Sequence, residues 1–250
     1  MTDVTKMNVI LNTVFGIFFW IVFLTCAVVC LSLVVVLPKL SWRQYMARAC
    51  ARAVFILTGT QPSKSGWDLL PTGPCVVVAN HASYLDGVLL FAYLRNGFSF
   101  VIKDEMQHVP LAGFVLRRIG QFFVEREHVQ RSARSTRQVI RAAKEGRPIG
   151  FFPEGTFTET PGLRRFRKGA FAVARSVELP VVPLVIQGTR GILPADRWLP
   201  HPGRISVEVL PIVDAPTVAS RPPEQLMTEV RSAIAARLDE PDLLDRELEA

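Results

Sequence analysis

The chain has 250 residues, which allows one sizeable α/β domain with an appendage and excludes two full domains of typical size. A formal net charge of +7 predicts an anionic partner, and the positive mean hydropathy of 0.27 argues against a plain nucleic-acid binder. The four cysteines show no C-x2-C spacing, which is typical of small buried side chains in a reducing compartment.

The first third of the chain carries a long apolar segment. Between Lys6 and Lys39 lie 32 residues without Asp, Glu, Lys or Arg. As a helix this segment would measure roughly 45 Å, against about 30 Å for the hydrocarbon core of a bilayer. The sequence therefore predicts a membrane helix, since the alternative, a buried core helix, needs a larger protein around it.

The charges around this segment predict its orientation. Basic residues gather after it, at Lys39, Arg43, Arg48 and Arg52. This bias places the following residues on the cytoplasmic side of the inner membrane.

A second helix is predicted after the break at Pro38. Residues 41–57 interleave apolar side chains with arginines, a pattern suited to an amphipathic helix lying in the headgroup region. Residues 58–74 are rich in Gly, Pro, Ser and Thr and read as a linker. We therefore expect a membrane-anchoring segment at 1–57 and an α/β domain at 58–250.

Strand and helix patterns alternate through this domain, which predicts a mostly parallel sheet with right-handed crossovers and flanking helices. The expected strands are 75–79, 98–102, 121–124, 148–152, 181–186 and 205–210. The expected helices are 87–94, 111–119, 129–144 and 223–238.

The first of these strands ends at a candidate catalytic base. His81 follows it directly, and Asp86 comes five residues later. Open α/β sheets place their ligand crevices at the carboxyl ends of the strands. A carboxylate at this distance can accept the proton of one imidazole nitrogen and leave the other nitrogen basic. Taken alone, such a spacing is more often a helix cap than a catalytic pair.

Further polar residues follow other strands. Lys103, Arg126 and the turn Glu154-Gly155-Thr156 each follow one, so a parallel sheet would gather them with His81 along one edge. There is no G-x-S-x-G nucleophile elbow, and Cys75 lies within a strand. The attacking group is therefore expected to belong to a substrate, and the net charge predicts that this substrate carries phosphate. No two histidines have metal-ligand spacing, so no metal site is predicted.

Four ordered motifs carry a family resemblance. NHASYLD at 80–86 resembles the N-H-x4-D motif of the glycerolipid acyltransferases, and 119–126 (IGQFFVER), 152–156 (FPEGT) and 181–189 (VVPLVIQGT) resemble their second, third and fourth motifs. RFRKG at 165–169 matches a phenylalanine followed by basic residues and Gly. The chain is most similar to the bacterial 1-acylglycerol-3-phosphate acyltransferases.

The resemblance implies an activity. It implies that His81, held by Asp86, deprotonates the free hydroxyl of a lysophospholipid, most simply 1-acylglycerol-3-phosphate, giving phosphatidic acid. The oxygen would attack an acyl thioester of coenzyme A or acyl-carrier protein directly, with no acyl-enzyme and no other cofactor.

The resemblance also implies an acceptor site. Arg126 would bind the acceptor phosphate, Glu154, Gly155 and Thr156 would shape the site, and Lys103 and Lys168 are further candidate substrate-binding cations. Two alternatives stay open: a surface ion pair for Arg126, and a role in orienting a loop for Glu154.

The chain departs from the family pattern at two positions. Glu125 stands where Asp is common, and Phe157 stands where an Arg after the Thr is common. The second departure leaves the acceptor open between lysophosphatidate, glycerol-3-phosphate and other lyso-lipids such as a lyso-ornithine lipid. A thioester hydrolase and a membrane lipid-binding protein of the same fold are the competing functions.

Overall fold

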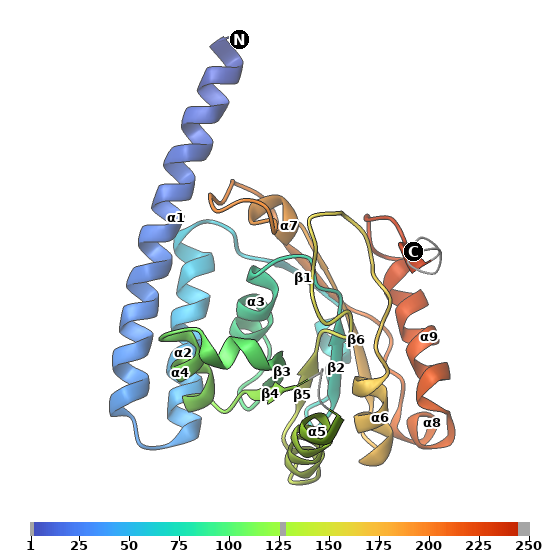
Figure 1. The fold of residues 1–250 in the computed structure, drawn as a ribbon. Coiled ribbons are helices and arrows are strands. Elements are labelled where there is room, and N and C mark those ends of the chain that lie inside the picture. Colours follow the sequence, from blue (N-terminus) through green and yellow to red (C-terminus); the bar gives the residue numbers. More distant parts are fainter. Residues whose placement is uncertain (1–2, 126–128, 245–250) are drawn as a thin grey trace.

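A seven-stranded sheet forms the centre of the molecule (Figure 1). The computed structural model describes residues 3–125 and 129–244. Its strands are β1 (Ser63–Ser65), β2 (Val76–Ala79), β3 (Ser99–Lys103), β4 (Phe122–Val124), β5 (Ile149–Phe151), β6 (Val181–Gln187) and β7 (Ser206–Val209).

The strands lie in the order β1-β7-β6-β2-β5-β3-β4. Every neighbouring pair is parallel except β6 and β7, which are antiparallel. The prediction of a mostly parallel sheet with flanking helices is therefore confirmed. β2 lies between β6 and β5, so the residues that follow it emerge at the middle of the sheet.

Helices cover both faces of this sheet. The longer ones are α1 (Asp3–Val36), α2 (Leu40–Leu57), α3 (Leu85–Tyr93), α5 (Val129–Lys144), α6 (Gly169–Ser176) and α9 (Pro223–Ala235). Shorter ones are η1 (Trp67–Leu69), η2 (Asp104–His108), α4 (Ala112–Arg118), α7 (Thr189–Ile192) and α8 (Ala215–Ser220).

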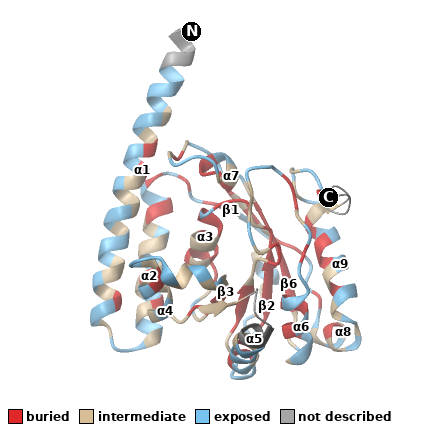
Figure 2. Ribbon diagram, viewed as in Figure 1, coloured by how far each residue is buried: buried red, intermediate tan, exposed pale blue. Residues whose placement is uncertain are grey.

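Alternate side chains of β2 pack into two different hydrophobic cores, one on each face of the sheet. Val77 and Ala79 pack in one core with α1, α2 and α3, whereas Val76 and Val78 pack in a second core with α6, α8 and α9. This is the period-two pattern of a strand buried on both faces, and all of β2 is buried. Figure 2 shows the buried residues concentrated along the sheet.

α1 and α2 form an antiparallel hairpin on one side of the molecule (Figure 1). α1 is long and apolar enough to cross a membrane, and only 11% of its apolar window is buried, which separates it from the core helix of a soluble protein. α2, in contrast, buries Val54 and Phe55 in the core shared with α3. The hairpin is thus packed against the domain; the division at residue 57 stays a prediction.

Some elements carry too little sequence signal to be predicted. β1 lies inside the segment expected to be a linker; it has three exposed polar residues at the edge of the sheet, with no apolar alternation. α6 and α8 were also not predicted, and both are short. Contacts with the sheet and with α9 stabilise α6, since isolated helices of this length are marginal.

Candidate active site

Asn80, the residue between β2 and His81, anchors the end of this strand to β6. Asn80 donates from Nδ2 to the carbonyl of Ile186 at 2.8 Å, and its Oδ1 accepts the N–H of the same residue at 2.8 Å. Both bonds are buried, so they join the last residue before His81 to β6. The main chain at His81 therefore leaves the sheet from a rigid position.

His81 and Asp86 form a dyad. Nδ1 of His81 lies 2.9 Å from Oδ2 of Asp86, which is fully buried in the first turn of α3. The same Oδ2 accepts the main-chain N–H groups of Ala82 and Ser83 at 2.6 and 2.8 Å. A carboxylate held in this way selects the tautomer with the proton on Nδ1, so Nε2 is the basic nitrogen.

Aromatic rings enclose the imidazole. The ring of Phe152 stacks on His81 with centroids 4.4 Å apart, and Phe157 meets it edge-on at 4.7 Å. Phe157 also contacts Tyr84, which is 60% exposed, with centroids 4.7 Å apart. The side chain of His81 is 17% exposed, so the imidazole is partly accessible beside these rings.

The side chain of Glu154 binds the main chain of His81. Its Oε1 accepts the N–H of His81 at 2.6 Å, and its Oε2 accepts the N–H of Arg164 at 3.0 Å. Burial raises the pKa of Glu154 to about 8; the two main-chain bonds oppose this shift and the nearby Asp86 adds to it. The geometry matches the loop-orienting alternative for Glu154.

Gly155 and Thr156 complete the turn that begins at Glu154. Gly155 has φ of 83°, in the left-handed region that favours glycine, and its N–H donates to the carbonyl of Phe152 at 3.0 Å. Thr156 is exposed, and its hydroxyl lies 3.3 Å from the carbonyl of Phe157. The turn therefore leaves Thr156 exposed, next in sequence to Phe157, whose ring contacts His81.

The two lysines predicted to bind substrate are in exposed ion pairs. Lys103, at the end of β3, pairs with Glu105 at 2.6 Å, and Lys168 pairs with Glu224 of α9 at 3.2 Å. Both lysines are exposed. Arg126 lies outside the described residues. Among the residues with a described position, no group of three His, Cys, Asp or Glu side chains could hold a metal ion.

Several site residues escaped the sequence reasoning. Asn80 and Phe152 are the first residues of the motifs at 80–86 and 152–156, but the sequence assigned neither of them a role. Phe157 was noted as a departure, but its ring contact with His81 requires the loop after β5 to fold back, which no local pattern indicates.

The geometry of the described residues is that of a base-and-carboxylate dyad, and the motifs around it lie in a segment that matches a known family. The family model described as Acyltransferase matches residues 61–187, about half of the chain, including the dyad and the motifs around it. The chain belongs to the Acyltransferase family.

Curated members of the acyltransferase family are similar to this chain. The 1-acyl-sn-glycerol-3-phosphate acyltransferase of Borreliella burgdorferi is 26% identical over 195 residues, covering 78% of each chain. A Chlamydomonas reinhardtii protein of the same name is 31% identical over 169 residues, 67% of this chain. The chain covers 49% of that protein and 50% of a chloroplast relative from Brassica napus, about half their length.

A solved structure shares the fold. The crystal structure of the 1-acyl-sn-glycerophosphate acyltransferase of Thermotoga maritima superposes with a TM-score of 0.74 and covers 93% of this chain and 95% of that one, at 22% identity. The similarity extends beyond the α/β domain, because coverage of this extent includes much of the α1–α2 hairpin.

Proposed function

We propose that this protein transfers a fatty acyl group from an acyl thioester to the free hydroxyl of 1-acylglycerol-3-phosphate, giving phosphatidic acid. Nε2 of His81 takes the hydroxyl proton as the oxygen attacks the thioester carbon. The tetrahedral intermediate then collapses, the carbon–sulfur bond breaks, and the imidazolium returns its proton to the thiolate. No acyl-enzyme forms in this sequence.

The 2.9 Å contact between His81 and Asp86 carries this proposal. It leaves one basic nitrogen beside an aromatic enclosure, and general-base catalysis of this kind supplies on the order of 10² to 10⁴ in rate. The names of the similar curated proteins support the acceptor. The donor is acyl-coenzyme A or acyl-carrier protein, and no other cofactor takes part.

We assign the acceptor phosphate to Arg126, two residues after β4. Gly155 and Thr156 shape the acceptor site beside His81, while Glu154 acts on the histidine main chain. Lys103 and Lys168 stay predicted substrate-binding cations.

We further propose that the α1–α2 hairpin docks the enzyme on the cytoplasmic face of the inner membrane. Trp20 of α1 donates from Nε1 to the carbonyl of Trp198 at 2.7 Å, so the middle of α1 contacts the α/β domain. The amino-terminal part of α1 extends beyond this contact (Figure 1), and apolar side chains along the helix, among them Ile10, Ile17 and Ile21, are exposed. An exposed apolar face on a helix that also packs against the domain suits insertion into one leaflet.

One experiment tests the proposed reaction. Purified protein is incubated with labelled acyl-coenzyme A or acyl-carrier protein, with and without lysophosphatidate, glycerol-3-phosphate or a lyso-ornithine lipid. We expect labelled phosphatidic acid that depends on lysophosphatidate and is absent with His81→Ala. Release of free fatty acid at the same rate without any acceptor would instead identify a hydrolase, and equal activity of His81→Ala would overturn the mechanism.

A further inference from the structure

The segment after α9 returns to the active-site side of the molecule. Leu163 forms an isolated parallel bridge with Asp242, its N–H donates to the carbonyl of Pro241 at 2.9 Å, and Leu243 donates back to Leu163 at 3.1 Å. Leu163 and Leu243 are both buried. The C-terminal segment is thus paired with the loop that follows the Glu154 turn, residues 156–164.

Arg190, the residue that follows the fourth motif, binds the first half of this loop. Arg190 makes two bonds to Glu240, at 2.7 and 3.0 Å, and donates from Nη1 to the carbonyl of Thr158 at 2.6 Å. Oε2 of Glu240 also accepts the N–H of Gly162 at 2.8 Å. Because the Arg190 side chain is only 13% exposed, water screens this pair weakly.

A second arginine holds the other half. Arg231 of α9 is 7% exposed, binds Asp242 through both terminal nitrogens, and donates to the carbonyls of Leu163 at 2.9 Å and Arg164 at 3.1 Å. The planar guanidinium suits this set of bonds, which an ammonium could not reproduce. We call Arg190, Arg231, Glu240 and Asp242 the C-terminal clasp.

Both halves of the loop act on the catalytic histidine. The N–H of Arg164 donates to Glu154, which accepts the N–H of His81, so Arg231 is connected to the histidine main chain through two bonded residues. On the other half, Thr158 follows Phe157, whose ring meets the imidazole. The clasp therefore fixes the main chain of the base and one wall of its approach.

We propose that the C-terminal clasp positions the 156–164 loop against His81, which makes Arg190 and Arg231 positioning residues for acyl transfer and places the C-terminal segment within the active-site architecture. This inference rests on the proposed function. It also assigns different effects to the two arginines: Arg231 acts on the base through Glu154, whereas Arg190 acts on the wall where the acceptor enters.

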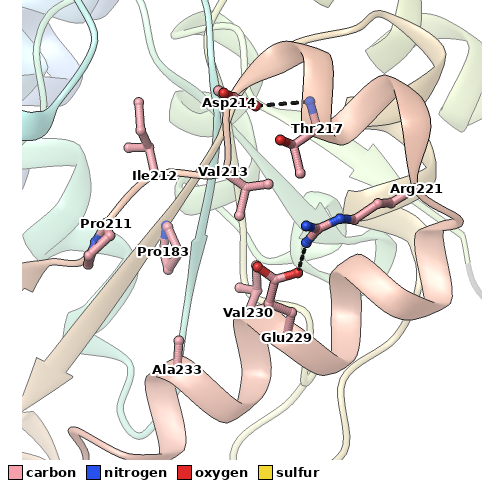
Figure 3. Close-up of a pocket in the computed structure, with 10 residues that line it drawn as sticks. All are labelled: Pro183, Pro211, Ile212, Val213, Asp214, Thr217, Arg221, Glu229, Val230 and Ala233. Carbon is pink, nitrogen blue, oxygen red and sulfur yellow. Dashed lines mark hydrogen bonds and ion pairs between the residues drawn. The ribbon is translucent and has the colours of Figure 1, made fainter.

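The matched variants are Glu240→Gln, Asp242→Asn and a control, Glu229→Gln. Glu229 also pairs with an arginine, Arg221, but Figure 3 shows this pair across an open pocket between α8 and α9, and none of His81, Glu154 or the described loop residues lines that pocket. The control removes an arginine partner on α9 without touching the loop.

Steady-state kinetics on the full-length protein separate the outcomes. Glu240→Gln should raise the acceptor KM about 5- to 20-fold with a smaller change in kcat, and Asp242→Asn should lower kcat about 10-fold with a smaller change in KM. Glu229→Gln should stay within about 2-fold of wild type in both. Arg231→Lys should resemble Asp242→Asn.

Hydrogen exchange distinguishes local loosening of the 156–164 loop from unfolding of the whole domain. In the two clasp variants the peptide covering 156–164 should exchange faster while β2 stays protected as in wild type. The inference is overturned if the loop exchanges faster and both kinetic constants match the control. It is also overturned if the apparent kcat falls only in proportion to the folded fraction while KM stays unchanged. A wild-type protein without acyl transfer would overturn the proposed function itself, which distinguishes the two failures.

Discussion

Arg52 of α2 donates from Nη2 to the carbonyl of Ala92 at 2.8 Å, in the last turn of α3. Arg48, one turn earlier on α2, donates to the carbonyls of Phe91 and Leu94. The two arginines thus bind carbonyls left without helical partners, where a cation is also favoured by the helix dipole. Because Asp86 lies in the first turn of the same helix, the α1–α2 hairpin is joined to the helix that carries the carboxylate of the dyad.

Arg48→Ala should therefore destabilise the domain and lower kcat. It removes bonds to two carbonyls, for which we expect a loss of about 1 to 3 kcal/mol and a several-fold lower kcat. Thermal unfolding in detergent and kinetics on a detergent-dispersed acceptor measure both effects. The matched control is Arg43→Ala, whose arginine binds Leu37 and Pro38 within the hairpin. Equal behaviour of the two variants would contradict a role for α3.

Glu154 gives the protein a specific pH dependence of stability. Burial raises its pKa from the ordinary value of 4.5 to about 8, so the folded protein keeps a proton that the unfolded chain releases between these values. Stability from this group is present below pH 4.5 and lost as the pH rises through about 8. Wild type should therefore lose stability relative to Glu154→Gln over this interval.

Unfolding midpoints measured in detergent at several pH values between 4 and 9 test this expectation. Glu154→Gln should be less active at every pH, because an amide can accept only one of the N–H groups of His81 and Arg164 through its oxygen. A constant stability difference between the two proteins across this range would show that Glu154 does not titrate there.

Local patterns were sufficient for much of the fold and for the dyad. The β-branched run of β2 and the change to polar residues at His81 are local signals, and a parallel sheet then brings the strand ends together without further information. Glu154 follows from the same argument, because it comes just after β5. Asp86 was paired with His81 only through their spacing and the family motif.

The contacts that fix the site were not predictable, because they join residues far apart in sequence. Nothing near Arg231 indicates that it binds the loop at Leu163, 68 positions away, and an arginine on an amphipathic helix is usually solvated. The arginines of α2 illustrate the same limit. They suggested a headgroup-facing surface, yet Arg48 and Arg52 bind carbonyls of α3.

Asp86→Asn should lower kcat by at least about 10², since a neutral amide cannot stabilise the imidazolium that forms when His81 takes the hydroxyl proton. The fold should persist, because the amide oxygen can still accept the N–H groups of Ala82 and Ser83. Circular dichroism and kcat measured on the same preparation check both statements. Denatured wild-type enzyme from a reaction with labelled donor should carry no covalent label, and a label on Cys75 would contradict direct transfer.

Arg126→Ala should raise the KM for lysophosphatidate by about 10- to 100-fold, the scale of one to three kcal/mol for a charge-assisted hydrogen bond. The donor KM should change little, because Arg126 follows β4 and we assign it to the acceptor phosphate. Arg126→Lys should restore binding only in part, since an ammonium cannot bind two phosphate oxygens in a planar fork. Kinetics with each substrate varied in turn measure these effects. If the donor KM rises and the lysophosphatidate KM does not, Arg126 binds the phosphates of the donor, and the acceptor phosphate lies nearer residues 164–168.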